Sequence, residues 1–148
     1  MQTPCSDYIE TKRLVYFARM LDKIRLNAAG QLSPGYFVGI TDDPTVFDAR
    51  CTRFLGVSYN DLVDRTLQGG SNEEILEWCF EQGNRPNEEE IEIWNGFILK
   101  RGWRDASSEE LESVKKENGL GDRDDIKTWV DFHDADERRV PGGVARPG

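Results

Sequence analysis

The sequence predicts a compact, mainly α-helical (all-α) single domain built from six or seven short helices. Apolar residues recur at the 3.6-residue period of a helix along several segments of the chain. Serine or asparagine stands three residues before a glutamate at the start of several of these segments, which is the spacing of a helix-capping box. Glycines follow most of the segments as stop signals. With 148 residues, the chain has a common single-domain size and can bury a substantial core.

The first predicted helix spans about Leu14 to Ala29. Its apolar residues form one stripe at helical spacing: Leu14, Phe17, Leu21, Ile24 and Ala28. The centre of this stripe marks the direction that faces the core. Arg25 then lies at the edge of the stripe beside Asp22, whereas Arg19 and Lys23 point further away from the core.

The segment after this helix is rich in turn-forming residues, and we expect one short extended segment, or a loop crossing the core, near Tyr36–Ile40. Six further helices are predicted from caps, apolar spacing and stop residues, over about Pro44 to Gly56, Ser58 to Gly69, Ser71 to Gly83, Asn87 to Gly102, Ser107 to Gly119 and Asp122 to His133.

We expect one helical domain over residues 1–139, with its core at 14–104 and an acidic helical extension at 105–139. Residues 140–148 are expected to form a flexible tail. The net charge is -9, and residues 105–137 carry 12 acidic and 4 basic side chains. An acidic surface repels phosphate groups, which disfavours nucleic acid and anionic membranes as partners. A protein, a small molecule or a second copy of this chain remains as the partner.

The cysteine content favours a reducing compartment. Cys5, Cys51 and Cys79 are odd in number and lack CxxC spacing, so free thiols are expected. Cys51 and Cys79 lie on apolar helix faces, where buried thiols are normally inert. No apolar run approaches the roughly 20 residues of a membrane-spanning helix, and the N-terminus lacks a signal-peptide core. We therefore expect a cytoplasmic protein.

Several motifs occur in a fixed order: YFARMLDKIR before Gly30, then FLGVSYNDL, SNEEILEW and EIEIWN. In this combination the chain resembles the bacterial family known as Domain of Unknown Function 5069, over about Tyr16 to Gly102. The stretch from RGWRD to DIKTWVDFHDADERR is similar to the longer members of that family, in which glycine is expected where Arg138 stands. This departure puts a tight turn after Glu137 in doubt. The resemblance implies a coherent domain of bacterial origin and no particular chemistry.

The first helix carries the leading candidate ligand-binding site, at Tyr16, Arg19, Asp22 and Arg25. A guanidinium at the boundary of a core needs a partner, because an unpaired buried charge is costly. In the structural interpretation, Asp22 supplies that partner to Arg25. This interpretation is favoured because ion-pair networks often serve only to hold a fold together. The functional interpretation makes Arg25 a clamp for a carboxylate or phosphate of a small ligand.

An acidic cluster lies at the end of the last predicted helix. Asp131, His133, Asp134 and Asp136 supply ligand types that a cation could use, but their spacing matches no calcium loop. We therefore predict no metal and no cofactor, and keep this cluster as the alternative metal site. His133 is the single histidine, no GxSxG motif occurs, and no cysteine has a base beside it in sequence. Nucleophilic catalysis is thus disfavoured.

A second surface candidate, for interaction with a partner, combines Trp78, Arg101, Trp103 and Arg104. Exposed aromatic and arginine side chains are typical anchors of protein interfaces. Because large aromatics are mostly buried, the favoured alternative is that Trp103 folds back over the fifth helix. The sequence thus favours a non-catalytic interaction or ligand-binding domain of a bacterial cytoplasmic protein. The alternative is a small metal-independent enzyme or small-molecule binder, whose pocket lies beside the first helix.

Overall fold

A computed structural model describes residues 1–39 and 42–141, in which seven helices and one β-hairpin are present. The mainly α-helical fold class is therefore confirmed. The elements in chain order are β1 (Glu10–Thr11), β2 (Leu14–Val15), α1 (Phe17–Ala28), α2 (Phe47–Leu55), α3 (Tyr59–Leu67), α4 (Asn72–Gln82), α5 (Glu88–Lys100), α6 (Ser108–Glu117) and α7 (Trp129–Asp136).

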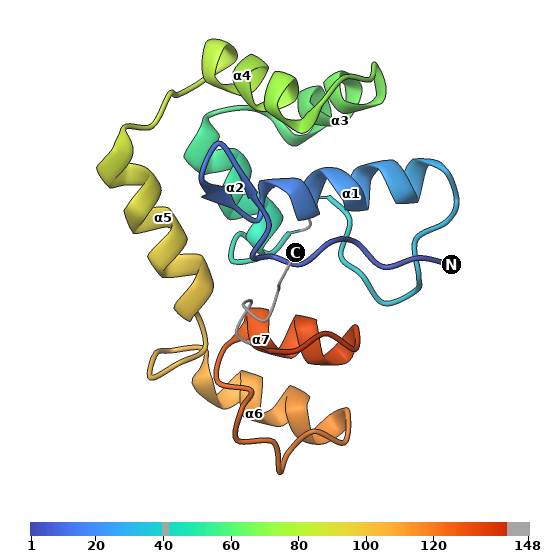
Figure 1. The fold of residues 1–148 in the computed structure, drawn as a ribbon, viewed down its shortest axis with the longest axis vertical. Helices are drawn as coiled ribbons and strands as arrows, with labels where there is room; N and C mark the ends of the chain where they lie inside the picture. Colours follow the sequence, from blue (N-terminus) through green and yellow to red (C-terminus); the bar gives the residue numbers. More distant parts are fainter. Residues whose placement is uncertain (40–41, 142–148) are drawn as a thin grey trace.

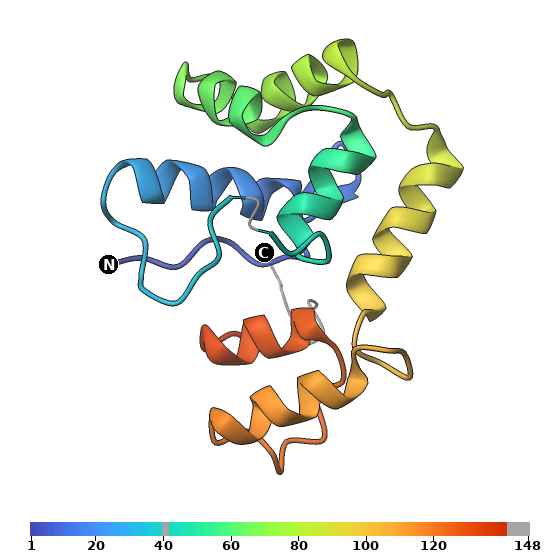
Figure 2. The same ribbon diagram turned by 180° about the vertical axis from the view of Figure 1, so that it is seen from behind.

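Helix α1 lies in the middle of the molecule, with α3 and α4 on one side and α6 and α7 on the other (Figure 1). Helix α5 runs along the outer edge and connects these two ends, as the view from behind also shows (Figure 2). The main hydrophobic core joins α1 to α2, α3, α4 and α5. A smaller cluster around Leu111, Ile126 and Phe132 packs α6 against α7.

The first helix begins at Phe17, three residues later than the sequence predicts. Leu14 and Val15 instead pair antiparallel with Thr11 and Glu10 in a hairpin. Its two turn residues have positive φ angles, 47° and 69°, which suit the twist of a tight hairpin. Because neither turn residue is the glycine or asparagine that usually marks such a turn, the hairpin had no clear sequence signal.

The extended segment expected near Tyr36–Ile40 does not form a strand in the described residues Tyr36–Gly39, and Ile40 lies outside the described residues. The last helix begins at Trp129 rather than near Asp122. The loop before it is held by Lys115, whose Nζ donates to the carbonyl oxygens of Arg123 and Ile126, each at 3.0 Å. These bonds from a side chain of α6 hold residues 123–126 in a loop, where a helix would form backbone hydrogen bonds instead.

Helix α7 ends in a tight turn, although an arginine occupies the position where glycine is expected. Arg138 adopts φ 64°, in the left-handed region. The Arg139 amide then donates to the Asp134 carbonyl at 2.6 Å, and the Arg138 amide donates to the Ala135 carbonyl at 3.0 Å. This is the bond pattern of a Schellman C-cap. The doubt about a turn after Glu137 is therefore removed.

Residues 142–148, most of the expected tail, lie outside the described residues. In the described part, no helix combines the length and apolar character needed to cross a membrane.

Candidate functional site

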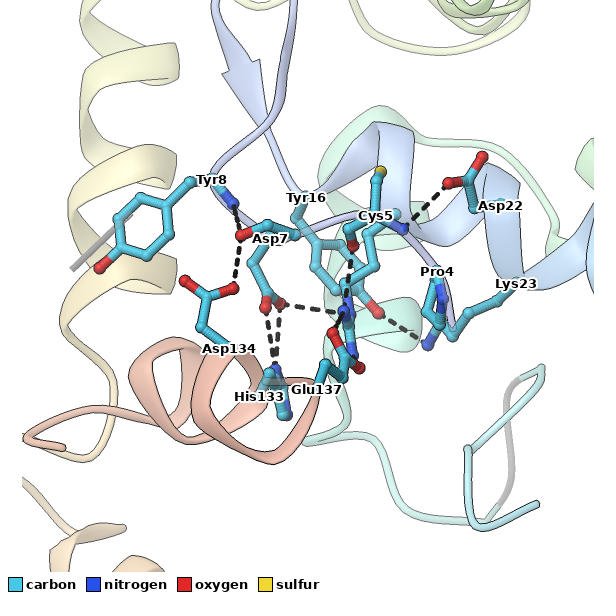
Figure 3. Close-up of polar contacts among 12 residues, drawn as sticks. Pro4, Cys5, Asp7, Tyr8, Tyr16, Asp22, Lys23, His133, Asp134 and Glu137 are labelled. Atoms are coloured by element: carbon cyan, nitrogen blue, oxygen red, sulfur yellow. Dashed lines mark hydrogen bonds and ion pairs between the residues drawn. The ribbon is translucent and has the colours of Figure 1, made fainter. Parts of the chain in front are cut away.

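Helix α1 is buried on more sides than its apolar stripe indicates. Arg19 and Lys23, which the sequence places facing away from the core, are both buried. The prediction for these two residues was wrong, because a second layer covers that side of the helix. The N-terminal segment runs along it, where Arg19 donates to the Cys5 carbonyl at 3.0 Å, and the end of α7 packs against it. Figure 3 shows the resulting group of polar side chains.

Arg19 forms a bidentate ion pair with Glu137 at the end of α7. Its two terminal nitrogens lie 2.8 and 2.7 Å from the two carboxylate oxygens. Tyr36 also donates its hydroxyl to Glu137 at 2.6 Å, and Arg139 pairs with the same carboxylate. Burial raises the pKa of Glu137, but Arg19, Tyr36 and Arg139 outweigh it and hold that pKa below its ordinary value. Glu137 is therefore a buried, ionised acceptor shared by three donors.

Asp7 lies fully buried between Arg19 and the imidazole of His133. Its carboxylate is 3.0 Å from His133 Nδ1 and 3.7 Å from Arg19 Nε. Burial raises the pKa of Asp7, yet the neighbouring His133 and Arg19 outweigh burial and lower it overall. An ionised Asp7 can only accept, so Nδ1 carries the hydrogen of this bond. Asp7 thereby fixes the orientation of the one histidine in the chain.

A second buried group surrounds Tyr16, which precedes α1. The hydroxyl of Tyr16 donates to Asp48 of α2 and accepts from Lys23 Nζ at 2.9 Å, while Lys23 also pairs with Asp48 at 2.9 Å. Burial raises the pKa of Tyr16 well above its ordinary value, and Asp48 raises it further. Tyr16 has φ 75° and ψ -33°, which is strained for a bulky residue. The surrounding bonds hold it there.

Of the four residues predicted for a site on the first helix, Tyr16 and Arg19 are brought into this network. Asp22 and Arg25 lie instead at the surface, each with a side chain 34% exposed and their charged atoms 3.8 Å apart. Asp22 accepts from the Cys5 amide at 3.0 Å, which ties the N-terminal segment to α1. The four residues therefore do not converge on one point.

Two surface hollows lie elsewhere on the described part of the molecule. The first, of about 400 Å³, is lined by residues of the α5–α6 loop, of α6 and of the α6–α7 connection. The second, of about 510 Å³, is lined by Val38, Gly39, Ser58, Tyr59, Asn60 and Val63. Neither is lined by Tyr16, Arg19, Asp22 or Arg25. The buried network therefore joins chain segments to one another and borders neither hollow.

The structure turns the side chains of the alternative metal cluster toward different partners. The Asp131 carboxylate accepts from the Lys127 amide at 3.1 Å, and the Asp131 amide donates to Thr128 Oγ1 at 3.1 Å. Asp134 accepts from Ser6 Oγ at 2.7 Å, His133 contacts the N-terminal segment, and Asp136 is exposed. Within residues 1–39 and 42–141, no group of three or more His, Cys, Asp or Glu side chains is placed to hold a metal ion.

The loop between α5 and α6 presents Trp103 and Arg104 at the surface. A Cβ on Gly102, which has φ 100°, would lie 2.9 Å from Leu111 and 3.1 Å from Trp129, so only glycine fits there. Asp105 accepts from the Gly102 amide at 2.9 Å and from the Ser107 amide at 2.9 Å. The loop is thus fixed by hydrogen bonds and close packing.

Trp103 does not fold back over α5. Its side chain is 46% exposed, and the Arg104 guanidinium lies over its ring, 5.1 Å from the ring centre. Both residues line the first hollow. Arg101 is close in the chain but half-buried, where it pairs with Asp105 at 3.4 Å. The expectation of a folded-back Trp103 was wrong because Gly102 turns the backbone outward and Trp129 occupies the space beneath it.

Trp78, the fourth residue of the predicted interaction patch, lies in α4 and packs against the main core. Helix α4 and the α5–α6 loop are at opposite ends of α5 in both views (Figures 1 and 2). The structure therefore brings Arg101, Trp103 and Arg104 together and leaves Trp78 apart from them.

All three cysteines are free, as the sequence predicts. Burial raises the pKa of Cys5 and of Cys79 to about 12 in each case, and raises that of Cys51 well above its ordinary value. Thiols with raised pKa values are poor nucleophiles near neutral pH.

The fold and these two regions define a small helical domain, which a buried network of ion pairs holds together and which presents Trp103 at its surface on the α5–α6 loop. The profile of the family described as Domain of unknown function (DUF5069) matches residues 1–139, and the chain belongs to that family. No curated protein matches the chain.

Sequence reasoning missed most of the buried network. Asp7, Asp48 and Glu137 lie far from α1 in sequence, and nothing in their local spacing links them to Arg19 or Lys23. One signal was available: Tyr16, Arg19 and Lys23 fall at helical spacing on one face, so a polar stripe accompanies the apolar one.

Proposed function

We propose that this protein is a non-catalytic binding domain and that Trp103 and Arg104 form its contact surface. The ligand that fits this surface is a protein segment with an apolar side chain next to an acidic one. The main support for the proposal is that the Trp103 side chain is 46% exposed, although hydrogen bonds fix the backbone of its loop. Exposed tryptophans of this kind are enriched among the residues that dominate protein interfaces.

The rigidity of the loop supports a binding role. The Trp129 amide donates to the Arg101 carbonyl at 2.9 Å, and the Trp129 indole donates to Ser107 Oγ at 2.6 Å, so α7 braces both ends of the loop. Arg104 also has φ 51°, a strained backbone conformation. A side chain already held in position loses little conformational entropy on binding.

The charges around Trp103 favour an acidic ligand. Arg104 has no carboxylate within ion-pair distance among the described residues, and its planar guanidinium suits bidentate binding of one. The hollow beside it is lined by three cationic side chains, Arg104, Lys115 and Lys127, and by two acidic ones, Glu112 and Asp124. This basic balance lies within a segment that is otherwise strongly acidic.

Two observations support the non-catalytic part of the proposal. Arg19, Asp7, Glu137 and His133 bind one another across three chain segments, and neither hollow reaches them. The thiols have raised pKa values. We place the protein in the bacterial cytoplasm, which its three free cysteines and its resemblance to a bacterial family support.

The test is selection of a random peptide library on the purified protein, followed by binding measurements with the selected peptides. We expect enrichment of sequences that combine an apolar and an acidic residue, and loss of their binding to Trp103→Ala and Arg104→Glu. Phe37→Ala, which removes another exposed aromatic side chain, is the matched control and should bind normally. Failure to enrich any sequence, or equal binding by Trp103→Ala, would contradict the proposal.

A further inference from the structure

Helix α5 has one face that is largely exposed among the described residues. The helix forms the outer edge of the molecule (Figures 1 and 2). Trp94 and Ile98 are buried in the main core. Ile93 points away from this core and is 64% exposed, and Phe97, at the edge of the same face, is 38% exposed. Two large apolar side chains at i and i+4 on the outside of a helix form the kind of anchor that docks against another helix.

Gly96 lies beside these two residues on the same outward face. A Cβ placed on Gly96 would meet no atom within 4 Å, so no contact within the described chain requires glycine there. In a helix interior, glycine is less favourable than alanine by about 1 kcal/mol. Glycine at such a position permits the close approach of another backbone. No described residue of this chain fills the space beside Gly96, which leaves that space open to a partner.

The two ends of α5 carry opposite charges. The first half presents Glu89 and Glu92, both exposed, and the second half ends in Lys100. Arg50 of α2 lies over the Phe97 ring at 4.9 Å, and Arg101 lies 5.6 Å from the centre of the same ring. The face is therefore acidic at one end, apolar in the middle and basic at the other end.

We propose that α5 pairs antiparallel with α5 of a second copy of this chain, forming a dimer with two-fold symmetry. Glu89, Ile93, Gly96 and Lys100 follow the i, i+4, i+7, i+11 spacing of one helix face. Reversal of the helix direction about the centre of this row places Glu89 opposite the partner's Lys100 and Ile93 opposite the partner's Gly96. The same face thus complements itself in both charge and shape, as a two-fold interface requires.

The size of the contact sets the expected strength. Eleven residue steps along a helix span about 16 Å. A contact of this length is at the small end of specific interfaces, so we expect a weak dimer that dissociates on dilution. The contact uses neither Trp103 nor Arg104, so the dimer and the proposed binding function can fail independently.

Sedimentation equilibrium of the full chain over a concentration series tests the dimer. We expect Glu89→Lys and Lys100→Glu each to weaken dimerisation by about tenfold, because each places two like-charge pairs across the two-fold axis. The double variant restores opposite charges and should return dimerisation close to that of the original chain. Glu117→Lys, which makes the same charge change on the exposed side of α6, is the matched control.

Gly96→Leu provides a second measurement that does not depend on charge. The added side chain has open space within its own chain, so the variant should fold, which circular dichroism will check. It should nevertheless remain monomeric, because it blocks the approach of Ile93 from the partner. A wild-type chain that is monomeric at its highest soluble concentration would overturn the proposal. A dimer unaffected by Gly96→Leu, or not restored in the charge-swapped double variant, would also overturn it.

Discussion

Replacement of Arg19 and replacement of Arg25, both in α1, should lower the free energy of unfolding by very different amounts. Arg19 is buried and pairs with two buried carboxylates, whereas Arg25 is one-third exposed and lies 3.8 Å from its partner Asp22. We compare Arg19→Met with Arg25→Met. Methionine keeps most of the apolar stem in both cases, so the comparison isolates the loss of the guanidinium.

The expected magnitudes follow from the two environments. Loss of one partner from a buried ion pair destabilises a protein by about 3 to 5 kcal/mol, because the other charge stays buried and unpaired. Arg19→Met leaves Glu137 with only Tyr36 and Arg139, and Asp7 with His133. For a chain of this length, we therefore expect Tm to fall by roughly 10 to 15 °C. The exposed pair of Arg25 should contribute only about 0.5 kcal/mol.

Urea denaturation followed by circular dichroism measures both free energies of unfolding. The double variant Arg19→Met with Glu137→Gln also removes the carboxylate that has lost its bidentate partner, and it should recover part of the loss, which would show that the two side chains are coupled. A free energy of unfolding for Arg19→Met within about 1 kcal/mol of the original chain would refute the argument that loss of the guanidinium beside Glu137 and Asp7 is costly here. An equal effect of Arg25→Met would refute it as well.

Two further predictions concern the end of α7 and the response to acid. Arg138→Gly should raise stability by about 1 kcal/mol, measured by thermal denaturation, because the exposed arginine at φ 64° is strained there and glycine is not. Gly119→Arg, the reverse change in the matching turn after α6 at φ 74°, should lower stability by a similar amount, and equal signs for the two changes would contradict this account. The pKa values of Asp7 and Glu137 are lower in the folded chain than their ordinary values, so the unfolded chain binds more protons as pH falls. The stability that they contribute should be present above about pH 4 and lost as pH falls below it. Glu137→Gln should flatten this loss in urea denaturation between about pH 5 and pH 2, and an unchanged slope would rule Glu137 out as a cause.

Local sequence signals were sufficient for most helices. The capping boxes at Ser71 and Asn87 both form, with each side chain bonded to the amide three residues on. Caps and apolar spacing act within one or two turns of a helix, so they can be read without knowledge of the fold. The start of α7 was missed because the bonds of Lys115 to the preceding loop cross from another helix.

The location of the exposed loop was predictable, but its exposure was not. Trp103 and Arg104, an aromatic residue next to a basic one, predicted an interaction surface in this segment. Whether Trp103 lies inside or outside depended on the close packing of Gly102 against Leu111 and Trp129, which only the assembled helices create.

The helical class, the order of the helices and the free state of the three cysteines could be derived from local periodicity, capping and cysteine spacing. The environment of α1 depends instead on how distant segments of the chain pack together. This packing brings Asp7 and Glu137, 130 residues apart in the numbering, to the same Arg19 side chain. The helical period predicts the direction of each side chain on a helix. The charged groups that a side chain contacts belong to the distant segments that pack against that face of the helix, and local spacing does not reveal them.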